Sequence, residues 1–445
     1  MKLLILGHDG RTHAIIWKLL QSPERLELVC APGNGGTAPL TVTAAIDADD
    51  IASIGRFAFD EQFDMVLPTS TDQVHRGLVE EILSLQIAVC ASSSRAAALE
   101  RSRCATKEFL LRHGLPTAPG RAFTNLETAE RYLATLPLPL MIKADHPAAG
   151  EARFDDRYAA LEGLRRLFAA RTLDGAGDGV VIESWLAGPR FVQSALSDGV
   201  TARSLPAVRL YDRLEADESG PQTAPIGAHS SNSPFAQQLT RFLHERALQP
   251  LVAALAADGL PAWGFVGVDT VIGGEGPRLT AIRFALREGE AQAVLVRLDD
   301  DLLPYLKAAL TRRLAELPPP RIAPDASVAI GLFARGFPVS FPYGGAPRGF
   351  ERLPDAVRVF HSATEHPDVV LPYTPRAVPG GFGAALSGLV VTPRSGGLRT
   401  TGGVPLVAAA RAATLAAARE RALAGADAMQ FDGRAYRADI GASEM

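Results

Sequence analysis

Short apolar runs alternate with amphipathic stretches over the first hundred residues. The runs at 2–7, 26–31, 64–68 and 86–91 have the length of buried strands, and helix-like patterns separate them. Strands that alternate with helices build a parallel sheet. We therefore predict a parallel α/β unit over residues 1–101.

Further along the chain, the apolar pattern favours longer helices and paired strands. The strands at 263–272 and 278–286 flank the turn sequence GGEGP and are expected to form a hairpin. The proline-rich stretch 317–325 indicates a linker, and a β-rich unit is expected after it. The remaining predicted helices lie at 102–119, 155–171, 235–257, 291–316 and 407–425, and the remaining predicted strands at 138–145 and 180–186.

Composition narrows the class of protein. Apolar residues make up 47% of the chain and charged residues 21%, which is typical of a globular protein. A net charge of −4 argues against a nucleic-acid partner. No apolar run reaches the roughly 18 residues that span a membrane, and the first residues lack the pattern of a signal peptide. Three cysteines without a CxxC pair indicate free thiols and a cytoplasmic protein.

Lysine is rare in this chain, so chemistry that needs an ammonium group has few candidates. Only five of the 45 basic residues are lysine. Lys143 lies in the apolar strand predicted at 138–145, directly before the small-residue loop HPAAGEA. An ammonium group in that place suits nucleotide phosphates, and a surface lysine is the alternative.

Two glycine-rich loops, GHDGR (7–11) and PGNGGT (32–37), each follow a predicted strand. Backbone N–H groups at a strand–helix junction favour a phosphate, and neighbouring strand ends flank one ligand crevice. Ordinary tight turns are the alternative. The polar stretch SGPQTAPIGAHS (219–230) is predicted to be a loop. Three histidines in or beside these loops lack metal-ligand spacing and are predicted to be solvated or structural, namely His13, His146 and His229.

Several stretches in collinear order match the motifs of one known family. The opening MKLLILGHDGRTHAIIWKLLQSP is similar to MKVLVIGxGGREHALxWKLxxSP, and APGNGGT is similar to APGNxGT. IKADHPAAGEA resembles IKADGLAAGKG, and VVIESWLAG resembles IVIEExLxG. SGPQTAPIGAHS resembles TGPNTGGMGAYS, and AQAVLVRLDDDL resembles TQxxLxRLxSDL. The chain therefore resembles the glycinamide ribonucleotide synthetase (phosphoribosylamine–glycine ligase) family of the ATP-grasp superfamily.

The resemblance implies a division of the chain into domains. It implies an N-terminal phosphoribosylamine-binding α/β domain at 1–101 and an ATP-grasp domain at 102–325, with a mobile lid at about 120–190. A β-rich α+β C-terminal domain at 326–428 and an extension at 429–445 follow. Members of this family join glycine to 5-phosphoribosylamine in purine biosynthesis, using ATP and Mg²⁺, so a small phosphorylated ligand is expected.

The resemblance also implies site residues where the chain matches the family's motifs. One group would contact the substrate phosphate and comes from the two glycine-rich loops. The other would contact the nucleotide. The phosphate group is Gly7, Gly10, Arg11, Gly33, Asn34 and Thr37, and the nucleotide group is Lys143, Glu183, Leu186 and Arg103.

Charged positions around the expected phosphates depart from the family pattern. Glu151 replaces the lysine of AAGKG, and Arg103 replaces another lysine. Pro189 and Arg190 replace an acidic pair. We expect Glu151 to repel the phosphates, with no counter-cation evident from the sequence.

The metal-binding strand departs from the pattern as well. In the family's EFNxRFGDPE, the glutamate and asparagine that hold Mg²⁺ become Ala281 and Arg283. Asp269 is then the sole candidate ligand, and one carboxylate does not make a site. We therefore assign no metal site, expect weak ATP binding and leave the Mg²⁺ requirement open.

Three hypotheses follow for the function. The chain is an active glycine ligase, a repurposed ATP-grasp ligase that joins a different amine and carboxylate, or a non-catalytic relative that binds a small ligand or a partner protein. Each lost charged contact to a phosphate costs about 1.5–3 kcal/mol. The substitutions therefore favour reduced or lost ligase activity from a degenerate active site.

Overall fold

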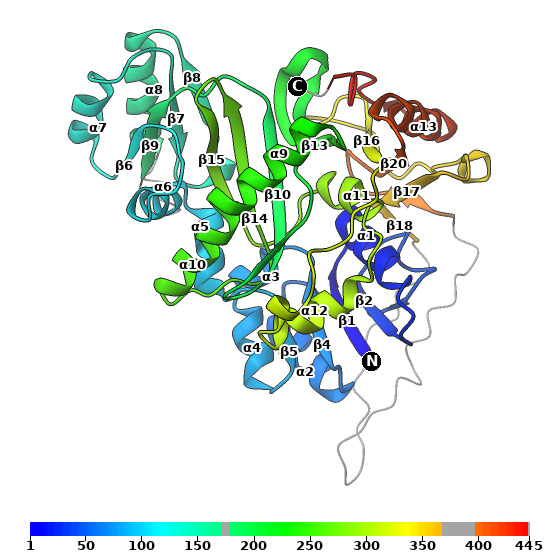
Figure 1. Ribbon diagram of the computed structural model, residues 1–445. Helices are drawn as coiled ribbons and strands as arrows, with labels where there is room; N and C mark the ends of the chain where they lie inside the picture. The colour runs from blue at the N-terminus through cyan, green and yellow to red at the C-terminus, as the bar shows by residue number, and fades with distance from the viewer. Residues whose placement is uncertain (171–178, 367–396, 444–445) are drawn as a thin grey trace.

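A computed structural model describes residues 1–170, 179–366 and 397–443. Its N-terminal part is a parallel sheet with the strand order β3-β2-β1-β4-β5, drawn in blue in Figure 1. The central strand β1 is apolar and almost entirely buried, as in a sheet covered on both faces. The predicted parallel α/β unit is confirmed. Its elements are β1 (Lys2–Gly7), α1 (Gly10–Leu19), β2 (Glu27–Pro32), β3 (Val42–Thr43), α2 (Ile51–Asp60), β4 (Met65–Pro68), α3 (Asp72–His75), α4 (Leu78–Ser84), β5 (Ala88–Val89) and α5 (Ser94–Arg101).

A second, four-stranded sheet has the order β6-β9-β7-β8 and pairs antiparallel. Helices α7 and α8 pack on it around a core of its own that includes Leu133, Leu164 and Ile182. Figure 1 shows this unit set apart at the upper left. Its elements, with the helix that precedes it, are α6 (Arg103–Arg112), β6 (Gly120–Phe123), α7 (Leu126–Leu133), β7 (Leu140–Ala144), a 3₁₀ turn (Pro147–Ala149), β8 (Glu151–Phe154), α8 (Arg157–Ala170) and β9 (Val180–Ser184).

The large sheet has the order β15-β14-β10-β12-β13-β16-β20-β17. Strands β14 and β15 pair antiparallel across GGEGP, so the predicted hairpin is confirmed. The pairing of β13 with β16 carries the sheet across residue 325, and the domain boundaries proposed from the sequence stay predictions. The strands are β10 (Arg190–Asp198), β11 (Ala202–Ser204), β12 (Val208–Glu215), β13 (Ser219–Ser230), β14 (Trp263–Gly273), β15 (Gly276–Arg283), β16 (Ala326–Ala334), β17 (Val357–His361), β20 (Leu406–Ala412) and β21 (Arg434–Ala435), and a separate ribbon pairs β18 (Thr364–Glu365) with β19 (Arg399–Thr400).

One helix of this region, α11, joins the parallel sheet to the large sheet. It packs against α1 on one side and against β13 and β16 on the other. None of the helices in the described ranges is long and apolar enough to cross a membrane. The helices are α9 (Pro234–Leu243), a π-helix (His244–Leu248), α10 (Gln249–Ala257), α11 (Glu290–Leu295), α12 (Leu302–Leu310) and α13 (Leu415–Ala428), with 3₁₀ turns at Ala216–Glu218, Leu314–Glu316 and Phe350–Arg352.

The prediction of a single helix at 291–316 is wrong. The structure divides this segment between α11, α12 and a 3₁₀ turn. The break has two local causes. Leu298 leaves the helical path to form a β-bridge with Ile322. The Asp301 carboxylate then starts α12 by accepting the Leu303 N–H at 3.0 Å, which is the usual role of an N-cap aspartate.

Two more segments differ from their predictions. The alanine-rich segment at 407–425 does not begin as a helix, because its first residues form β20 between β16 and β17. The helix α13 starts only after Thr414 caps it. The segment 219–230, predicted to be a loop, is strand β13. In both places pairing with distant strands outweighs local propensity.

Candidate active site

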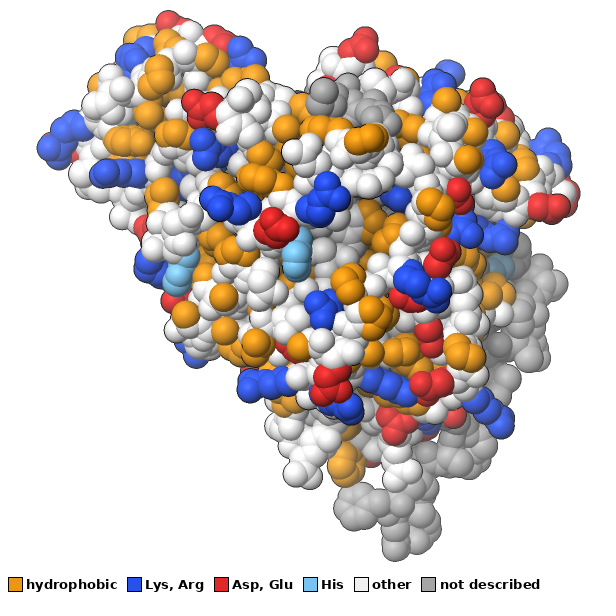
Figure 2. All heavy atoms as spheres, viewed as in Figure 1, with side chains coloured by type: hydrophobic (Ala, Val, Ile, Leu, Met, Phe, Trp, Pro, Cys, Tyr) orange, Lys and Arg blue, Asp and Glu red, His pale blue; other side chains and the backbone are white. Residues whose placement is uncertain are grey.

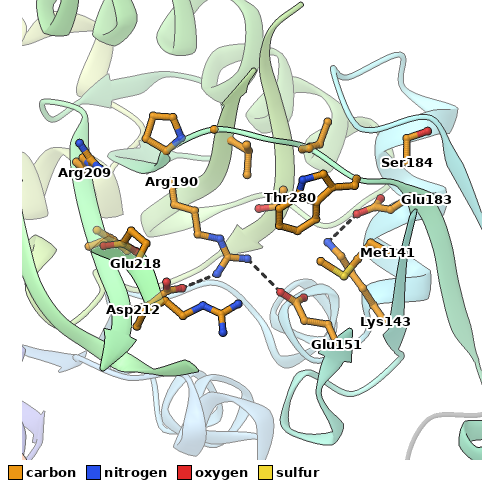
Figure 3. A pocket seen from close by; sticks show the side chains of 17 residues that line it. Met141, Lys143, Glu151, Glu183, Ser184, Arg190, Arg209, Asp212, Glu218 and Thr280 are labelled. Atoms are coloured by element: carbon orange, nitrogen blue, oxygen red, sulfur yellow. Dashed lines mark hydrogen bonds and ion pairs between the residues drawn. The ribbon is translucent and has the colours of Figure 1, made fainter. Parts of the chain in front are cut away.

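A cavity of about 220 Å³ opens between the four-stranded sheet and the large sheet. Figure 3 shows its walls, with Lys143 from β7 and Glu183 from β9 on one side and Arg190 and Asp212 from the large sheet on the other. Three of the four predicted nucleotide residues, Lys143, Glu183 and Leu186, line this cavity. The fourth, Arg103, lines a smaller cavity of about 80 Å³ that shares Lys143 and Arg190 with the first. The sequence therefore located these four side chains in one region.

Glu183 holds two lysines in the wall of the larger cavity. Its carboxylate lies 2.7 Å from the Lys143 Nζ and 2.7 Å from the Lys107 Nζ. Burial by itself would raise the pKa of Glu183, but the two ammonium groups outweigh it and hold that pKa below its usual range. Burial lowers the pKa of Lys107. The pairing holds one lysine at the cavity and a second behind it.

Sequence reasoning missed Lys107 as a site residue. Its side chain is only 3% exposed and also donates to the Thr117 hydroxyl at 3.1 Å. The sequence does contain a hint of this role. Lys107 is one of only five lysines, and the apolar stretch FLL follows it after one residue. Its role is to position Glu183, which in turn orients Lys143.

Glu151 has counter-cations, so the expectation that it lacks them is wrong. Its carboxylate lies 3.1 Å from the guanidinium of Arg103 and 3.1 Å from that of Arg190. Burial would raise the pKa of Glu151, but Lys143, Arg190 and Arg103 together lower it. Arg190 also pairs with Asp212 at 2.5 Å, as the dashed lines in Figure 3 show. Glu151 and Arg190 therefore form an ion pair in the wall of the cavity.

The smaller cavity contains a second group of ion pairs. The Asp269 carboxylate lies 3.0 Å from the Arg283 guanidinium and 2.5 Å from that of Arg287. Arg283 reaches Glu100 on α5 as well, at 3.3 Å. Burial opposes ionisation of Asp269, but the two arginines lower its pKa to about 2. Asp269 is therefore an anion that two cations already neutralise.

The residues at the expected metal position do not fit Mg²⁺. This ion requires oxygen ligands in octahedral geometry, whereas position 281 is an alanine and position 283 an arginine. The carboxylate of Asp269 already forms ion pairs with two guanidinium groups. Within the described residues there is no cluster of three or more aspartate, glutamate, histidine or cysteine side chains that would hold a metal ion.

The two glycine-rich loops meet at the ends of β1 and β2, which are paired in register. The Gly33 N–H donates to the Gly7 carbonyl at 3.0 Å. The Asn34 side-chain amide donates to the His8 carbonyl at 3.0 Å, and its backbone N–H donates to the Thr37 hydroxyl at 2.8 Å. The structure thus brings the predicted phosphate-binding residues of both loops together.

The N–H groups at the start of α1 are already occupied by side chains from later in the sequence. The Gly10 N–H donates to the Ser362 hydroxyl at 3.1 Å, and the Arg11 N–H donates to the Glu288 carboxylate at 3.2 Å. The approach is so close that a Cβ on Gly10 would overlap the Glu288 carboxylate. Glu288 therefore occupies the place where the motif predicts a phosphate.

The environment of Glu288 disfavours the negatively charged form of its carboxyl group. Burial and then the negative charge of Asp9 raise its pKa to about 7, although Arg11 acts in the opposite direction. Ser362 and Gln292 both donate to its carboxylate, at 2.7 and 2.6 Å. Sequence reasoning missed Glu288 and Ser362, since nothing local connects them to a loop near the beginning of the chain.

Two of the three singled-out histidines are structural, as predicted. His13 accepts the His361 backbone N–H at 3.0 Å, and burial lowers its pKa to about 4. The ring of His229 lies 3.0 Å from the Tyr211 hydroxyl, and burial lowers its pKa to about 3. Both rings are therefore uncharged at neutral pH.

Comparison with known proteins identifies the class to which this fold and site belong. Residues 1–100 match the N domain of phosphoribosylglycinamide synthetase, and residues 101–293 match its ATP-grasp (A) domain. The crystal structure of phosphoribosylamine–glycine ligase from Thermotoga maritima is similar with a TM-score of 0.78 and 23% identity. That similarity covers 99% of this chain and 100% of the other. The fold is that of an ATP-grasp protein.

Sequence relatives then identify the family. The phosphoribosylamine–glycine ligase of Phenylobacterium zucineum is 32% identical over 444 residues, which cover 99% of each chain. That of Caulobacter vibrioides is 31% identical over 444 residues, covering 99% of this chain and 98% of the other. This chain belongs to the phosphoribosylamine–glycine ligase family, and the resemblance seen in its motifs is confirmed.

Proposed function

We propose that this member of the phosphoribosylamine–glycine ligase family has reduced or lost its Mg²⁺-dependent ligase activity and binds nucleotide weakly. The observation that carries the proposal is Asp269, whose carboxylate holds Arg283 and Arg287 where the superfamily would place a metal ion. A guanidinium supplies positive charge, but it cannot bridge two phosphates in octahedral geometry.

The charge balance of the cavity supports the same conclusion. Arg103, Arg190, Arg283 and Arg287 each have a carboxylate partner in the folded chain. Polyphosphate binding would have to replace these pairs rather than meet free cations. Because breaking a buried pair leaves one charge uncompensated, part of the phosphate interaction would be lost in the exchange.

The N-terminal crevice remains the better place for a phosphorylated ligand. The second glycine-rich loop keeps its family residues, the first keeps Gly7, Gly10 and Arg11 but has Asp9 where the motif has a glycine, and the loops are in contact. We propose that Gly7, Gly10, Arg11 and Asn34 contact such a ligand once the Glu288 carboxylate is neutralised or displaced. Cytoplasmic location and binding to a partner protein stay predictions from the sequence.

Calorimetry with ATP tests the proposal. We expect weak binding whose dissociation constant changes less than about twofold when Mg²⁺ is chelated, because no ligand set couples the ion to the chain. The matched control is Ala281→Glu with Arg283→Asn, which restores the family's metal ligands and should make binding depend on Mg²⁺. Micromolar binding of MgATP to the unmodified chain that disappears on chelation would contradict the proposal.

An active ligase of the family is the second candidate. Identity of about one third over 99% of the chain favours it, as does the retained pairing of Lys143 with Glu183 at 2.7 Å. These features keep the shape of the nucleotide cavity and one phosphate-binding cation. The growth experiment in the Discussion distinguishes the two candidates.

A further inference from the structure

A third cavity, of about 680 Å³, shares no lining residue with the two cavities of the candidate active site. It lies among α9, the π-helix that follows it, strand β11 and the proline-rich stretch 317–325. Figure 2 shows a face of the molecule on which blue Lys and Arg side chains are interspersed with red Asp and Glu side chains.

The wall of this cavity includes a buried arginine that forms no salt bridge with a carboxylate in the described residues, although the negative charge of Asp325 acts on it from a longer distance. Arg297 is 4% exposed. Its Nη1 donates to the Ser230 hydroxyl at 2.6 Å and to the Ser231 carbonyl at 3.2 Å, and its Nη2 donates to the Ala323 carbonyl at 3.2 Å. All three acceptors are neutral, and the Nε has no hydrogen-bond partner among the described residues. Burial lowers the pKa of Arg297 to about 10, which reflects the unfavourable environment of its charge.

The other polar groups of the cavity also favour an anion. Arg203 and Arg241 line it, whereas Glu245 is the one acidic side chain in the described lining. The N–H groups of Arg203 are directed to backbone carbonyls, so its charge is not paired there either. His244, the first residue of the π-helix, lies 2.8 Å from the Ser204 hydroxyl and adds a polar ring. Turns of π-helix are frequent at functional sites.

The remaining lining is apolar and suits the body of a small organic molecule. It consists largely of side chains from the proline-rich stretch and from residues 202–206. These residues include Leu205, Ala236, Pro319, Pro320, Ile322 and Pro324.

We propose that this cavity binds a small organic anion, with a carboxylate or phosphate group near Arg297 and an apolar body against the prolines. The anion would place a counter-charge in direct contact with Arg297, on which Asp325 acts only from beyond salt-bridge distance. Charge-assisted hydrogen bonds to a guanidinium are the strong ones. The proposal is independent of activity at the ATP-grasp cavity, because the two sites share no residue.

Binding of three probes to the full chain tests the proposal. Benzoate and phenyl phosphate share a ring and differ in the charged group, and benzyl alcohol has the ring without a charge. We expect at least one of the anions to bind about tenfold or more tightly than the alcohol in calorimetry, and the comparison of the two anions identifies the preferred group.

Two variants on one exposed face of α9 locate the binding. Gln237 lines the cavity and Gln238 does not, and both side chains are exposed. Gln237→Trp should block the cavity and weaken anion binding at least about tenfold, whereas Gln238→Trp should change it less than about twofold. Arg297→Met should weaken binding by at least as much as Gln237→Trp.

The tryptophan pair decides the outcome if Arg297→Met fails to fold. Anion binding that is unchanged by Gln237→Trp, or no preference for the anions over benzyl alcohol, would overturn the proposal.

Discussion

At the scale of single residues, Glu288 is the group whose state decides access to the start of α1. Its carboxylate accepts the Arg11 N–H that the loop motif would present to a phosphate. Because burial and Asp9 raise its pKa to about 7, the side chain is neutral below that pH and anionic above it. A neutral Glu288 no longer repels an incoming phosphate.

Ribose 5-phosphate should therefore bind more tightly at pH 6.5 than at pH 8, by about five- to tenfold. Glu288→Gln should remove most of this dependence and bind at pH 8 about tenfold more tightly than the unmodified chain. Calorimetry at both pH values measures the effect. Glu290→Gln is the control, because burial raises the pKa of Glu290 to about 7 as well. Its carboxylate accepts hydrogen bonds from the Ser194 hydroxyl and the Arg287 backbone N–H, and not from the N–H groups at the start of α1.

If Glu288→Gln kept the full pH dependence, the titrating group would be another one. If ribose 5-phosphate bound to neither protein, the N-terminal crevice would not be a phosphate site.

At the scale of elements, strands β14 and β15 are held together by charge as well as by their backbone pairing. Arg283 on β15 joins Asp269 on β14 and Glu100 on α5, at 3.0 and 3.3 Å. These side chains are at most 22% exposed, so solvent screens the pairs only in part. Arg283 is thus part of the packing of this region.

Arg283→Met should lower the free energy of unfolding by about 2 kcal/mol, because Glu100 and Asp269 each lose a charged hydrogen bond. Arg278→Met is the matched control on the same strand. Its partner Glu275 is 83% exposed, so the loss should stay below about 1 kcal/mol. Urea unfolding of the two variants at pH 7 measures the difference. Equal effects would show that the Arg283 pairs do not stabilise the fold.

At the scale of the whole molecule, the question is whether the chain performs the family's reaction. The ATP-grasp fold, the cavity and Lys143 are present, whereas the described residues provide no Mg²⁺ ligand set. Phosphoryl transfer depends on cations that neutralise charge on the transferred group. In this chain Arg190 is already paired with Glu151 and Asp212, and Arg283 is already paired with Asp269.

We expect that the unmodified gene does not restore growth without purines in an auxotroph that lacks the glycine ligase. Combined reversion with Glu151→Lys, Ala281→Glu and Arg283→Asn should raise ATP turnover. Arg190→Glu belongs in that set, since a lysine at 151 would otherwise face Arg190. Growth supported by the unmodified gene at normal expression would make the active ligase the better interpretation.

The sequence by itself determined the features that local pattern and motif encode. The apolar run of β1 and the alternation after it predicted the parallel sheet, and the motif IKAD located Lys143 in a strand beside a small-residue loop. Glu183 and Leu186 were placed at the same cavity by their motif alone. The sheet and the strand are confirmed because each depends on residues that are close together in the chain, whereas nucleotide binding by Lys143, Glu183 and Leu186 stays a prediction.

Only the tertiary structure decided which distant groups meet. The alanine-rich residues of β20 favour a helix locally, but they pair with β16 and β17 on either side. Glu151 gained two counter-cations from other elements, and Glu288 reached the start of α1 across 277 residues of sequence. Charge and strand pairing act through space, so no short window of the sequence contains both partners.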